Sequence, residues 1–285
     1  MRAVYINGEY LPEDQAKVSV FDRGFLMADG VYEVTSVVAG KLLDFEGHLK
    51  RLQRSLNALD MAMPLTREEF LAIHRRLLEL NQLQEGLIYL QVTRGNPKDR
   101  DFAFPDPNTP NTVVLFTQSK ELLGSAIDTY GLKIISIPDL RWGRRDIKTV
   151  QLLYPSMGKM QAKAAGCDDA WMVDNQGYVT EGTASNAYII KDRTLITRDL
   201  SHSILAGITR AALLGFADKM GLAIQERPFT VAEAQDADEA FVTAATSFAL
   251  GVVEIDGIKI GTGEVGLITA QLRQIYIQES LKHAL

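Results

Sequence analysis

The sequence predicts an α+β fold in two domains. Strand-like and helix-like segments alternate along the 285 residues without the regular period of βαβ units, which argues against a doubly wound sheet. The pattern weakens over residues 121–132, between two strand-rich regions, and this indicates an interdomain linker. We therefore expect a small N-terminal α/β domain over residues 1–120 and a larger mixed β/α domain over residues 133–285.

The first domain is predicted to open with a β-hairpin. Asn7-Gly8 joins two short β-like runs in AVYINGEYL, and this dipeptide is the strongest short hairpin signal. Strands are also expected in VYEVTSVVAG and KLLDF. Apolar residues at helical spacing predict helices over residues 48–61 and 66–83, and the second begins with a capping box at Thr66-Arg67-Glu68-Glu69.

A long loop is expected between the next two strands. The runs LIYLQVTRG and NTVVLFTQS are rich in β-formers and border residues 96–111, which contain three prolines. A loop of this length is rarely a simple connector, so it is a candidate binding loop.

The second domain is predicted to mix strands with three helices. Strands are expected in LKIISIP, AWMVDNQGYVTEG, NAYIIKDRTLIT and EAFVTAATSFALGVVEIDG. The helices are expected over residues 154–165, 207–220 and 265–282.

Composition narrows the class of function. A net charge of -6 and a pI near 5.3 disfavour nucleic acid and anionic membranes as partners, because both require a dense basic patch. The single cysteine, Cys167, forms no intramolecular disulfide, and no cysteine-histidine cluster predicts a metal site. With neither a signal peptide nor a membrane-spanning stretch, we expect a cytoplasmic protein that binds a small molecule or a second copy of itself.

One lysine interrupts an apolar, β-branched run. Lys148 lies in RRDIKTVQLL, residues 144–153, where a strand is expected. A lysine on a strand is ordinarily solvated. If it is buried, desolvation lowers its pKa and leaves a neutral amine that can form a Schiff base. The residue alone leaves both interpretations open.

Three further features have both a structural and a chemical interpretation. A fourth, Arg51, has only a structural one when taken alone. Glu181, within VTEGTASNAYII, is either part of a polar turn or a buried acid. Gly207 and Thr209 begin a helix, which is either simply capped or an anion site. Residues 241–251 form a strand end packed with small residues or approached by a ligand. Arg51, on the polar face of its helix, is ordinarily solvated.

Taken together, these features meet the needs of one cofactor, pyridoxal 5'-phosphate. Its aldehyde requires an amine, its ring nitrogen an acidic partner, and its phosphate hydrogen-bond donors and positive charge.

The segments DRGF with DGVYE, RWGRRDIK, VTEGTASNAYII and LAGITR occur in this order and resemble the fold-type IV (class IV) pyridoxal-phosphate aminotransferases. The resemblance covers residues 21–257, and RWGRRDIK and VTEGTASNAYII are most similar to the D-amino acid transaminase branch. It implies the two-domain fold-type IV architecture and a homodimer.

The resemblance also implies roles for individual residues. Lys148 would form the Schiff base and then move a proton as general base and acid, while Glu181 would partner the pyridine nitrogen. Leu205 would lie behind the cofactor ring. Arg51, Ile208 and Thr209 would surround and bind the cofactor phosphate.

Two departures from the family pattern concern binding. Ala244 and Ala245 stand where family members often have hydroxyl residues, so we expect Thr246 or backbone N–H groups to contact the phosphate instead.

The second departure concerns the substrate carboxylate, which an arginine, a histidine two residues later and a tyrosine bind in the D-amino acid branch. Arg100 and Tyr32 are present, but Phe102 replaces the histidine. A more apolar pocket would admit bulkier D-amino acids or an (R)-amine.

We therefore expect ping-pong transamination between a D-amino acid, such as D-alanine or D-glutamate, and a 2-oxo acid. The alternatives on this fold are a branched-chain L-amino acid aminotransferase, an (R)-amine transaminase and an aminodeoxychorismate lyase. A protein that holds the cofactor without catalysis is the alternative outside enzymology.

Overall fold

The computed structural model describes residues 1–285, and the chain divides into two compact units. The first unit contains Met1–Leu122, Ile147–Gln151 and His283–Leu285, and the second contains Leu123–Asp146 and Leu152–Lys282. The short segment with Lys148 thus groups with the first unit, although the residues on both sides of it group with the second. The division predicted from the sequence contains no such excursion and stays a prediction.

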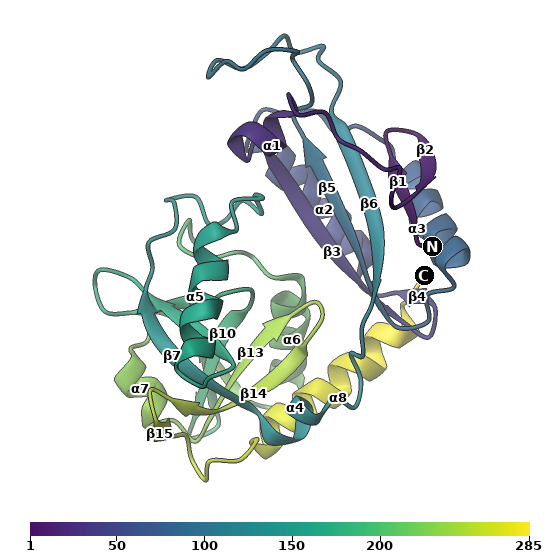
Figure 1. The fold of residues 1–285 in the computed structure, drawn as a ribbon. Coiled ribbons are helices and arrows are strands. Elements are labelled where there is room, and N and C mark those ends of the chain that lie inside the picture. Colours follow the sequence, from purple (N-terminus) through teal and green to yellow (C-terminus); the bar gives the residue numbers. More distant parts are fainter. The chain divides into compact units, whose positions relative to one another are not determined.

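A sheet of six antiparallel strands forms the first unit, in the order β2-β1-β6-β5-β3-β4. Helices α2 and α3 pack on one face of this sheet (Figure 1), where Leu52, Leu56 and Leu77 are fully buried with the inward residues of β3 and β5. The elements are β1 (Ala3–Ile6), β2 (Glu9–Pro12), α1 (Arg23–Met27), β3 (Gly30–Val38), β4 (Lys41–Leu42), α2 (Phe45–Asn57), α3 (Arg67–Asn81), β5 (Gly86–Thr93) and β6 (Thr112–Ser119).

The predicted local signals of the first unit are confirmed. Asn7 and Gly8 both have positive φ, 48° and 104°, as the central residues of a type I′ hairpin turn require. At the start of α3, the Thr66 hydroxyl accepts the Glu69 N–H, and the Glu69 carboxylate accepts the Thr66 N–H. This capping box fixes the helix start one residue after its cap.

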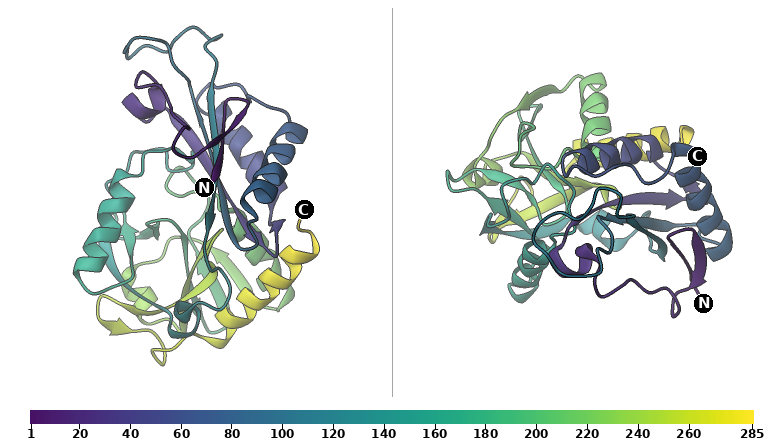
Figure 2. Two further views of the ribbon diagram at one scale, coloured as in Figure 1. Left: turned by 45° about the vertical axis from the view of Figure 1, so that its right-hand side comes forward. Right: turned by 90° about the horizontal axis from the view of Figure 1, so that it is seen from above.

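A larger mixed sheet of nine strands forms the second unit. Its order is β12-β11-β10-β13-β14-β7-β8-β9, and β15 pairs with β14. Figures 1 and 2 show helices α5, α6 and α8 beside this sheet. The elements are α4 (Ala126–Tyr130), β7 (Leu132–Pro138), α5 (Leu153–Ala164), β8 (Asp169–Val173), β9 (Val179–Gly182), β10 (Asn186–Lys191), β11 (Thr194–Thr197), α6 (Ile208–Lys219), β12 (Ala223–Glu226), α7 (Val231–Gln235), β13 (Glu239–Ala244), β14 (Phe248–Ile255), β15 (Ile258–Lys259) and α8 (Leu267–Lys282).

The predicted α+β class is confirmed, since β7 pairs in parallel with β8 and β14 while β10, β13 and β14 pair antiparallel. Each predicted helix of this unit lies within one or two residues of its expected limits. No sequence pattern predicted the short helices α1, α4 and α7 or the short strands β12 and β15. No helix combines the length and the apolar character needed to span a membrane.

Candidate active site

Lys148 lies beside the first half of β3, in the first unit. The backbone N–H of Tyr32 donates to the Lys148 carbonyl at 3.0 Å, and the Val150 N–H donates to the Gly30 carbonyl at 3.1 Å. Between them, Thr149 forms an isolated antiparallel bridge with Val31. The expected strand over this run is therefore wrong: the segment makes one bridge and then leaves the sheet, and α5 begins at Leu153.

The Lys148 side chain is half-buried and contacts an aromatic ring. Its Nζ lies 4.1 Å from the centre of the Tyr32 ring. Tyr32 in turn stacks on Tyr89, with ring centroids 5.5 Å apart and planes inclined at 22°. The amine is thus held against a rigid aromatic surface and remains reachable by a small molecule.

Arg51 is not on a solvated helix face, as its sequence position suggested, but is buried on α2. Its Nε and Nη2 donate to the two carboxylate oxygens of Glu33 at 2.8 and 2.7 Å. His48 Nδ1 lies 2.8 Å from the same carboxylate. Burial by itself raises the pKa of Glu33, but Arg51 and then His48 outweigh it and hold the pKa at about 2. The arginine is therefore fixed by a buried acid.

Glu181 is the next-to-last residue of β9 in the second unit and is buried. Arg141 Nη1 donates to its Oε1 at 2.5 Å, and Oε2 accepts the Leu205 N–H and the Asn186 Nδ2–H, both at 3.1 Å. Burial raises the pKa of Glu181, and the Arg141 cation opposes this shift. The residue is a buried acid and not part of a solvated polar turn.

The start of α6 lies next to this acid. Asn186 Nδ2 also donates to the Leu205 carbonyl at 2.9 Å, so one amide links Glu181 to the segment that leads into the helix. Gly207 precedes α6 and makes no side-chain cap. A Cβ on Gly207 would lie 2.1 Å from Asn186 Oδ1, so a larger residue here would displace the amide that bonds Glu181 and Leu205.

The first turn of α6 contains Ile208 and Thr209. Thr209 is buried, with its hydroxyl 3.5 Å from that of Tyr276 on α8. A helix start without a side-chain cap directs backbone N–H groups and the positive end of the helix dipole outward, which suits an anion.

Thr246 lies in the turn between β13 and β14 and is half-buried. The strand ends on either side pair Ala244 with Phe248. Arg273 of α8 holds the turn by donating to the Ser247 carbonyl at 2.5 Å. The alanines at 244 and 245 leave Thr246 and Ser247 as the hydroxyl residues of this turn.

Arg100 and Phe102 lie in the long loop between β5 and β6, which extends past the strand ends (Figure 1). Both are exposed, Phe102 to 78%, and the Arg100 guanidinium lies 4.8 Å from the Phe102 ring centre. No hydrogen bond, ion pair or ring contact joins either residue to Tyr32. The structure therefore brings Tyr32 to Lys148 but not to the other two expected substrate residues.

The middle of this loop is anchored through its backbone. Arg23 donates to the carbonyls of Asp101 and Ala103 at 2.6 and 3.1 Å, and the Arg94 guanidinium lies 3.8 Å from the Phe104 ring centre. Asp29 bonds both arginines. The loop backbone is thus bonded to Arg23 on both sides of Phe102, although the Phe102 side chain is exposed.

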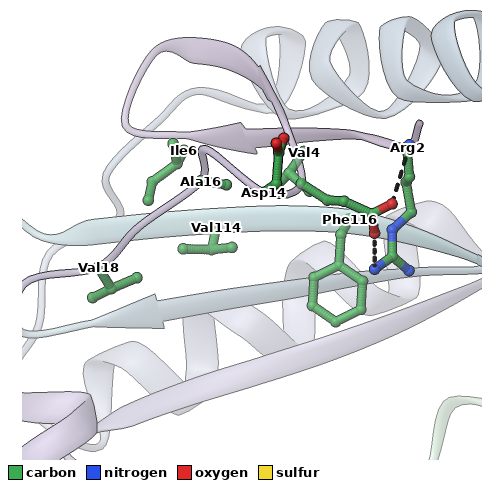
Figure 3. A pocket seen from close by; sticks show the side chains of 9 residues that line it. Arg2, Val4, Ile6, Asp14, Ala16, Val18, Val114 and Phe116 are labelled. Carbon is green, nitrogen blue, oxygen red and sulfur yellow. Dashed lines mark hydrogen bonds and ion pairs between the residues drawn. The ribbon is translucent and has the colours of Figure 1, made fainter.

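A cavity of about 320 Å³ lies elsewhere on the first unit. Figure 3 shows Val4, Ile6, Val114 and Phe116 of the sheet along its wall and Arg2 at one end. Arg2 forms an ion pair with Glu13, another lining residue, at 2.8 Å. None of the expected site residues lines it. No group of three or more histidine, cysteine or acidic side chains is placed to hold a metal ion.

The residues that hold the expected site residues in place were not predicted from the sequence. Glu33 and His48 fix Arg51, while Arg141 and Asn186 fix Glu181. The only sequence signal for any of these four residues was the position of Arg141 at the start of the motif RWGRRDIK. The contacts themselves join residues that are distant in the sequence.

Comparison with known proteins defines the class. The model of the family Amino-transferase class IV matches residues 30–255. The chain belongs to the class IV aminotransferases, and is thus an aminotransferase.

Among named relatives, D-alanine aminotransferase from Staphylococcus epidermidis (strain ATCC 12228 / FDA PCI 1200) is 35% identical over 286 residues, covering 100% of both chains. D-alanine aminotransferase from Listeria monocytogenes serotype 4b (strain F2365) is also 35% identical, over 97% of this chain and 95% of its own.

Solved structures support the same fold. A branched-chain amino acid aminotransferase from T.th., solved with pyridoxamine 5'-phosphate, is 26% identical, with a TM-score of 0.89 over 98% of this chain and 94% of its own. The Escherichia coli branched-chain enzyme, at 21% identity and a TM-score of 0.86, covers 97% of this chain and 93% of its own and shows the fold alone. The fold-type IV architecture is confirmed.

Proposed function

We propose that the protein is a pyridoxal-5'-phosphate-dependent transaminase that exchanges an amino group between a D-amino acid and a 2-oxo acid. One observation supports the cofactor above the others: Glu181, a buried acid, bonds the Leu205 N–H, and α6 begins without a side-chain cap at Ile208. An acid for a ring nitrogen and an anion-binding helix start thus lie together in one unit. This donor set fits the cofactor.

Bound pyridoxal 5'-phosphate would supply an aldehyde for the amino group and a ring that withdraws electrons from the α-carbon. Lys148 would hold the cofactor through its Nζ. The free Lys148 amine would carry the substrate α-proton, first as general base and then as general acid. The half-buried position against Tyr32 suits both roles, because the amine is oriented but not sealed off.

The other residues would bind and orient the cofactor. Glu181 would hold the proton of the ring nitrogen, and Leu205 would pack behind the ring. The residues proposed for the phosphate are Arg51, Ile208, Thr209 and Thr246.

The D-amino acid is proposed from the full-length similarity to D-alanine aminotransferases at 35% identity. Tyr32 would bind the substrate carboxylate beside Lys148, and Arg100 and Phe102, which do not contact Tyr32, would meet the substrate from the exposed loop. With phenylalanine in place of an imidazole, the pocket would favour bulkier side chains than alanine alone.

A branched-chain L-amino acid aminotransferase is the second candidate, because solved structures of that activity share the fold at 26% identity. A substrate panel of D-alanine, D-glutamate, L-leucine, L-valine and an (R)-amine, each with 2-oxoglutarate, separates these activities. Pyruvate released from aminodeoxychorismate without an acceptor would indicate a lyase. Turnover of a D-amino acid is the expected result, and turnover of the L-amino acids alone would refute the proposal.

We further propose that the enzyme acts as a cytoplasmic homodimer. The first unit exposes several large apolar side chains near its loop, and such surfaces ordinarily become buried in an interface. They are Val18, Val20, Phe21, Phe25 and Phe102. Sedimentation analysis tests this assignment: a monomer at micromolar concentration would contradict it.

A further inference from the structure

Arg141 and Asp139 form a buried ionic cluster with Glu181 in the second unit. Arg141 Nε and Nη2 donate to the two oxygens of the Asp139 carboxylate at 2.9 and 2.7 Å, and Nη1 donates to Glu181 at 2.5 Å. The Arg141 side chain is 12% exposed and that of Asp139 is fully buried. All three nitrogens of one guanidinium thus donate hydrogen bonds to two carboxylates.

Asp139 is itself fixed in place. The Thr180 hydroxyl donates to Asp139 Oδ2 at 2.7 Å, and Arg145 Nε lies 3.3 Å from the same oxygen. The two-point contact with Asp139 leaves only Nη1 of Arg141 for Glu181. The guanidinium plane, and with it the direction of the bond to Glu181, is therefore set by a residue that does not touch Glu181.

We propose that Arg141 is a positioning residue that holds the Glu181 carboxylate charged and in one orientation, so that the proton it shares with the cofactor resides on the ring nitrogen. This inference rests on the proposed function, in which Glu181 faces that nitrogen. Arg141 touches neither cofactor nor substrate in this role and acts only through Glu181.

The physical reason is a competition between burial and charge. Burial favours the neutral acid, and the nearby Asp139 carboxylate acts in the same direction, whereas Arg141 and the Leu205 N–H favour the anion. Without Arg141, Glu181 would keep the proton as a neutral acid and donate it in a hydrogen bond. The ring would then be uncharged and would withdraw electrons less strongly during proton transfer by Lys148.

The test compares Arg141→Met with Arg198→Met. Arg198 forms a similar pair with Asp174, at 3.0 Å and with 11% of its side chain exposed, but it does not touch Glu181. Each holoenzyme is prepared with pyridoxal 5'-phosphate and, separately, with an analogue in which carbon replaces the ring nitrogen. The rate of the first half-reaction is followed by stopped-flow absorbance, using the amino donor found active in the substrate panel.

With the natural cofactor, Arg141→Met should slow the half-reaction by about 10- to 100-fold, the range found when a group that orients a functional ligand is removed. Arg198→Met should react like the wild type. With the carbon analogue, Arg141→Met and the wild type should react at the same low rate, because Glu181 then has no ring nitrogen to act on. Arg141→Lys should recover part of the rate, since it restores the charge but not the geometry.

Equal slowing of Arg141→Met with both cofactors would indicate a merely structural role and overturn the inference, as would a natural-cofactor rate equal to that of Arg198→Met. If Arg141→Met does not fold, Arg141→Gln removes the charge and permits the same comparison. Borohydride reduction of the wild type distinguishes a failure of the proposed function from a failure of the role proposed for Arg141. Failure to label Lys148 would overturn the proposed function itself, whereas labelling with no cofactor-dependent effect would overturn only the role of Arg141.

Discussion

Lys148 and Tyr32 are joined twice, once through the backbone and once through their side chains. The Tyr32 N–H donates to the Lys148 carbonyl at 3.0 Å, and Lys148 Nζ lies 4.1 Å from the centre of the Tyr32 ring. The backbone bond fixes the lysine beside β3, and the ring limits the space open to its amine. A flexible side chain is thereby oriented without the burial that would seal it from a substrate.

Replacing Lys148 tests its proposed covalent role. Lys148→Ala should lose the pyridoxyl label that borohydride reduction leaves on the wild-type peptide. Its half-reaction should slow by at least about 10²- to 10⁴-fold, because the general base and acid is gone. Lys159→Ala, on the exposed side of α5, serves as the control. A labelled Lys148→Ala variant with the wild-type rate would show that another amine holds the cofactor.

Tyr32→Phe separates the ring of Tyr32 from its hydroxyl. The ring that contacts Lys148 remains, so cofactor labelling should persist. Loss of a hydrogen bond to a charged carboxylate, worth about 1.5–3 kcal/mol, should raise the KM for a D-amino acid by about 10- to 100-fold. Steady-state kinetics with D-alanine measure this change. An unaltered KM would mean that the hydroxyl does not bind the substrate.

Phe102→His tests why the substrate pocket departs from the family pattern. The imidazole would add a hydrogen-bond donor for a carboxylate beside Arg100 and remove apolar surface. We expect a lower KM for D-alanine and a lower ratio of (R)-amine to D-alanine activity. Phe104→His, which replaces the ring stacked on Arg94, is the matched control. If the ratio does not change, Phe102 plays no part in substrate selection.

Glu33→Gln should destabilise the first unit. It removes the charge that pairs with buried Arg51, and breaking a buried ion pair costs about 3–5 kcal/mol. The exposed pair of Arg67 and Glu46 offers a control, because Glu46→Gln should cost less than about 1 kcal/mol. Denaturant unfolding at pH 7 measures both. Equal stability of the two variants would contradict the account of the Arg51 site.

The same carboxylate gives a pH dependence with a definite sign. The pKa of Glu33 is lowered from 4.5 to about 2 in the folded protein. A lowered folded-state pKa contributes stability that is complete above the unfolded value and is lost as the pH falls toward the folded value. The stability difference between wild type and Glu33→Gln should therefore be constant above about pH 5 and shrink between pH 4.5 and 2. A difference that grows on acidification would contradict the ion pair.

The elements predicted from local signals were found because those signals act within a few residues. The Asn7-Gly8 turn, the Thr66 capping box and the helix after Gly207 each depend on contacts within one turn. Strand β12 was missed because its pairing with β11 is non-local and its four residues, two apolar followed by two polar, show no alternation. Helix α1 is only five residues long, too short for a periodic pattern.

The sequence predicts site residues but not the residues that hold them. Lys148 and Glu181 are predicted from their types and motifs and Thr209 from its place in a helix start, and their roles stay predictions. The burial of Arg51 could not, because the acid that compensates its charge, Glu33, comes from a different element. Likewise, the Arg141 contact with Glu181 joins residues forty positions apart. Such contacts follow from tertiary packing and leave no local pattern.

We propose above that the enzyme takes its amino group from a D-amino acid. The direct measurement is a single-turnover assay in which the enzyme with bound pyridoxal 5'-phosphate is mixed with D-alanine or, separately, with L-leucine, and the keto acid released is quantified. We predict stoichiometric pyruvate from D-alanine and no 4-methyl-2-oxopentanoate from L-leucine. Keto acid from L-leucine, with none from D-alanine, would contradict the proposed substrate class and assign the protein to the branched-chain enzymes.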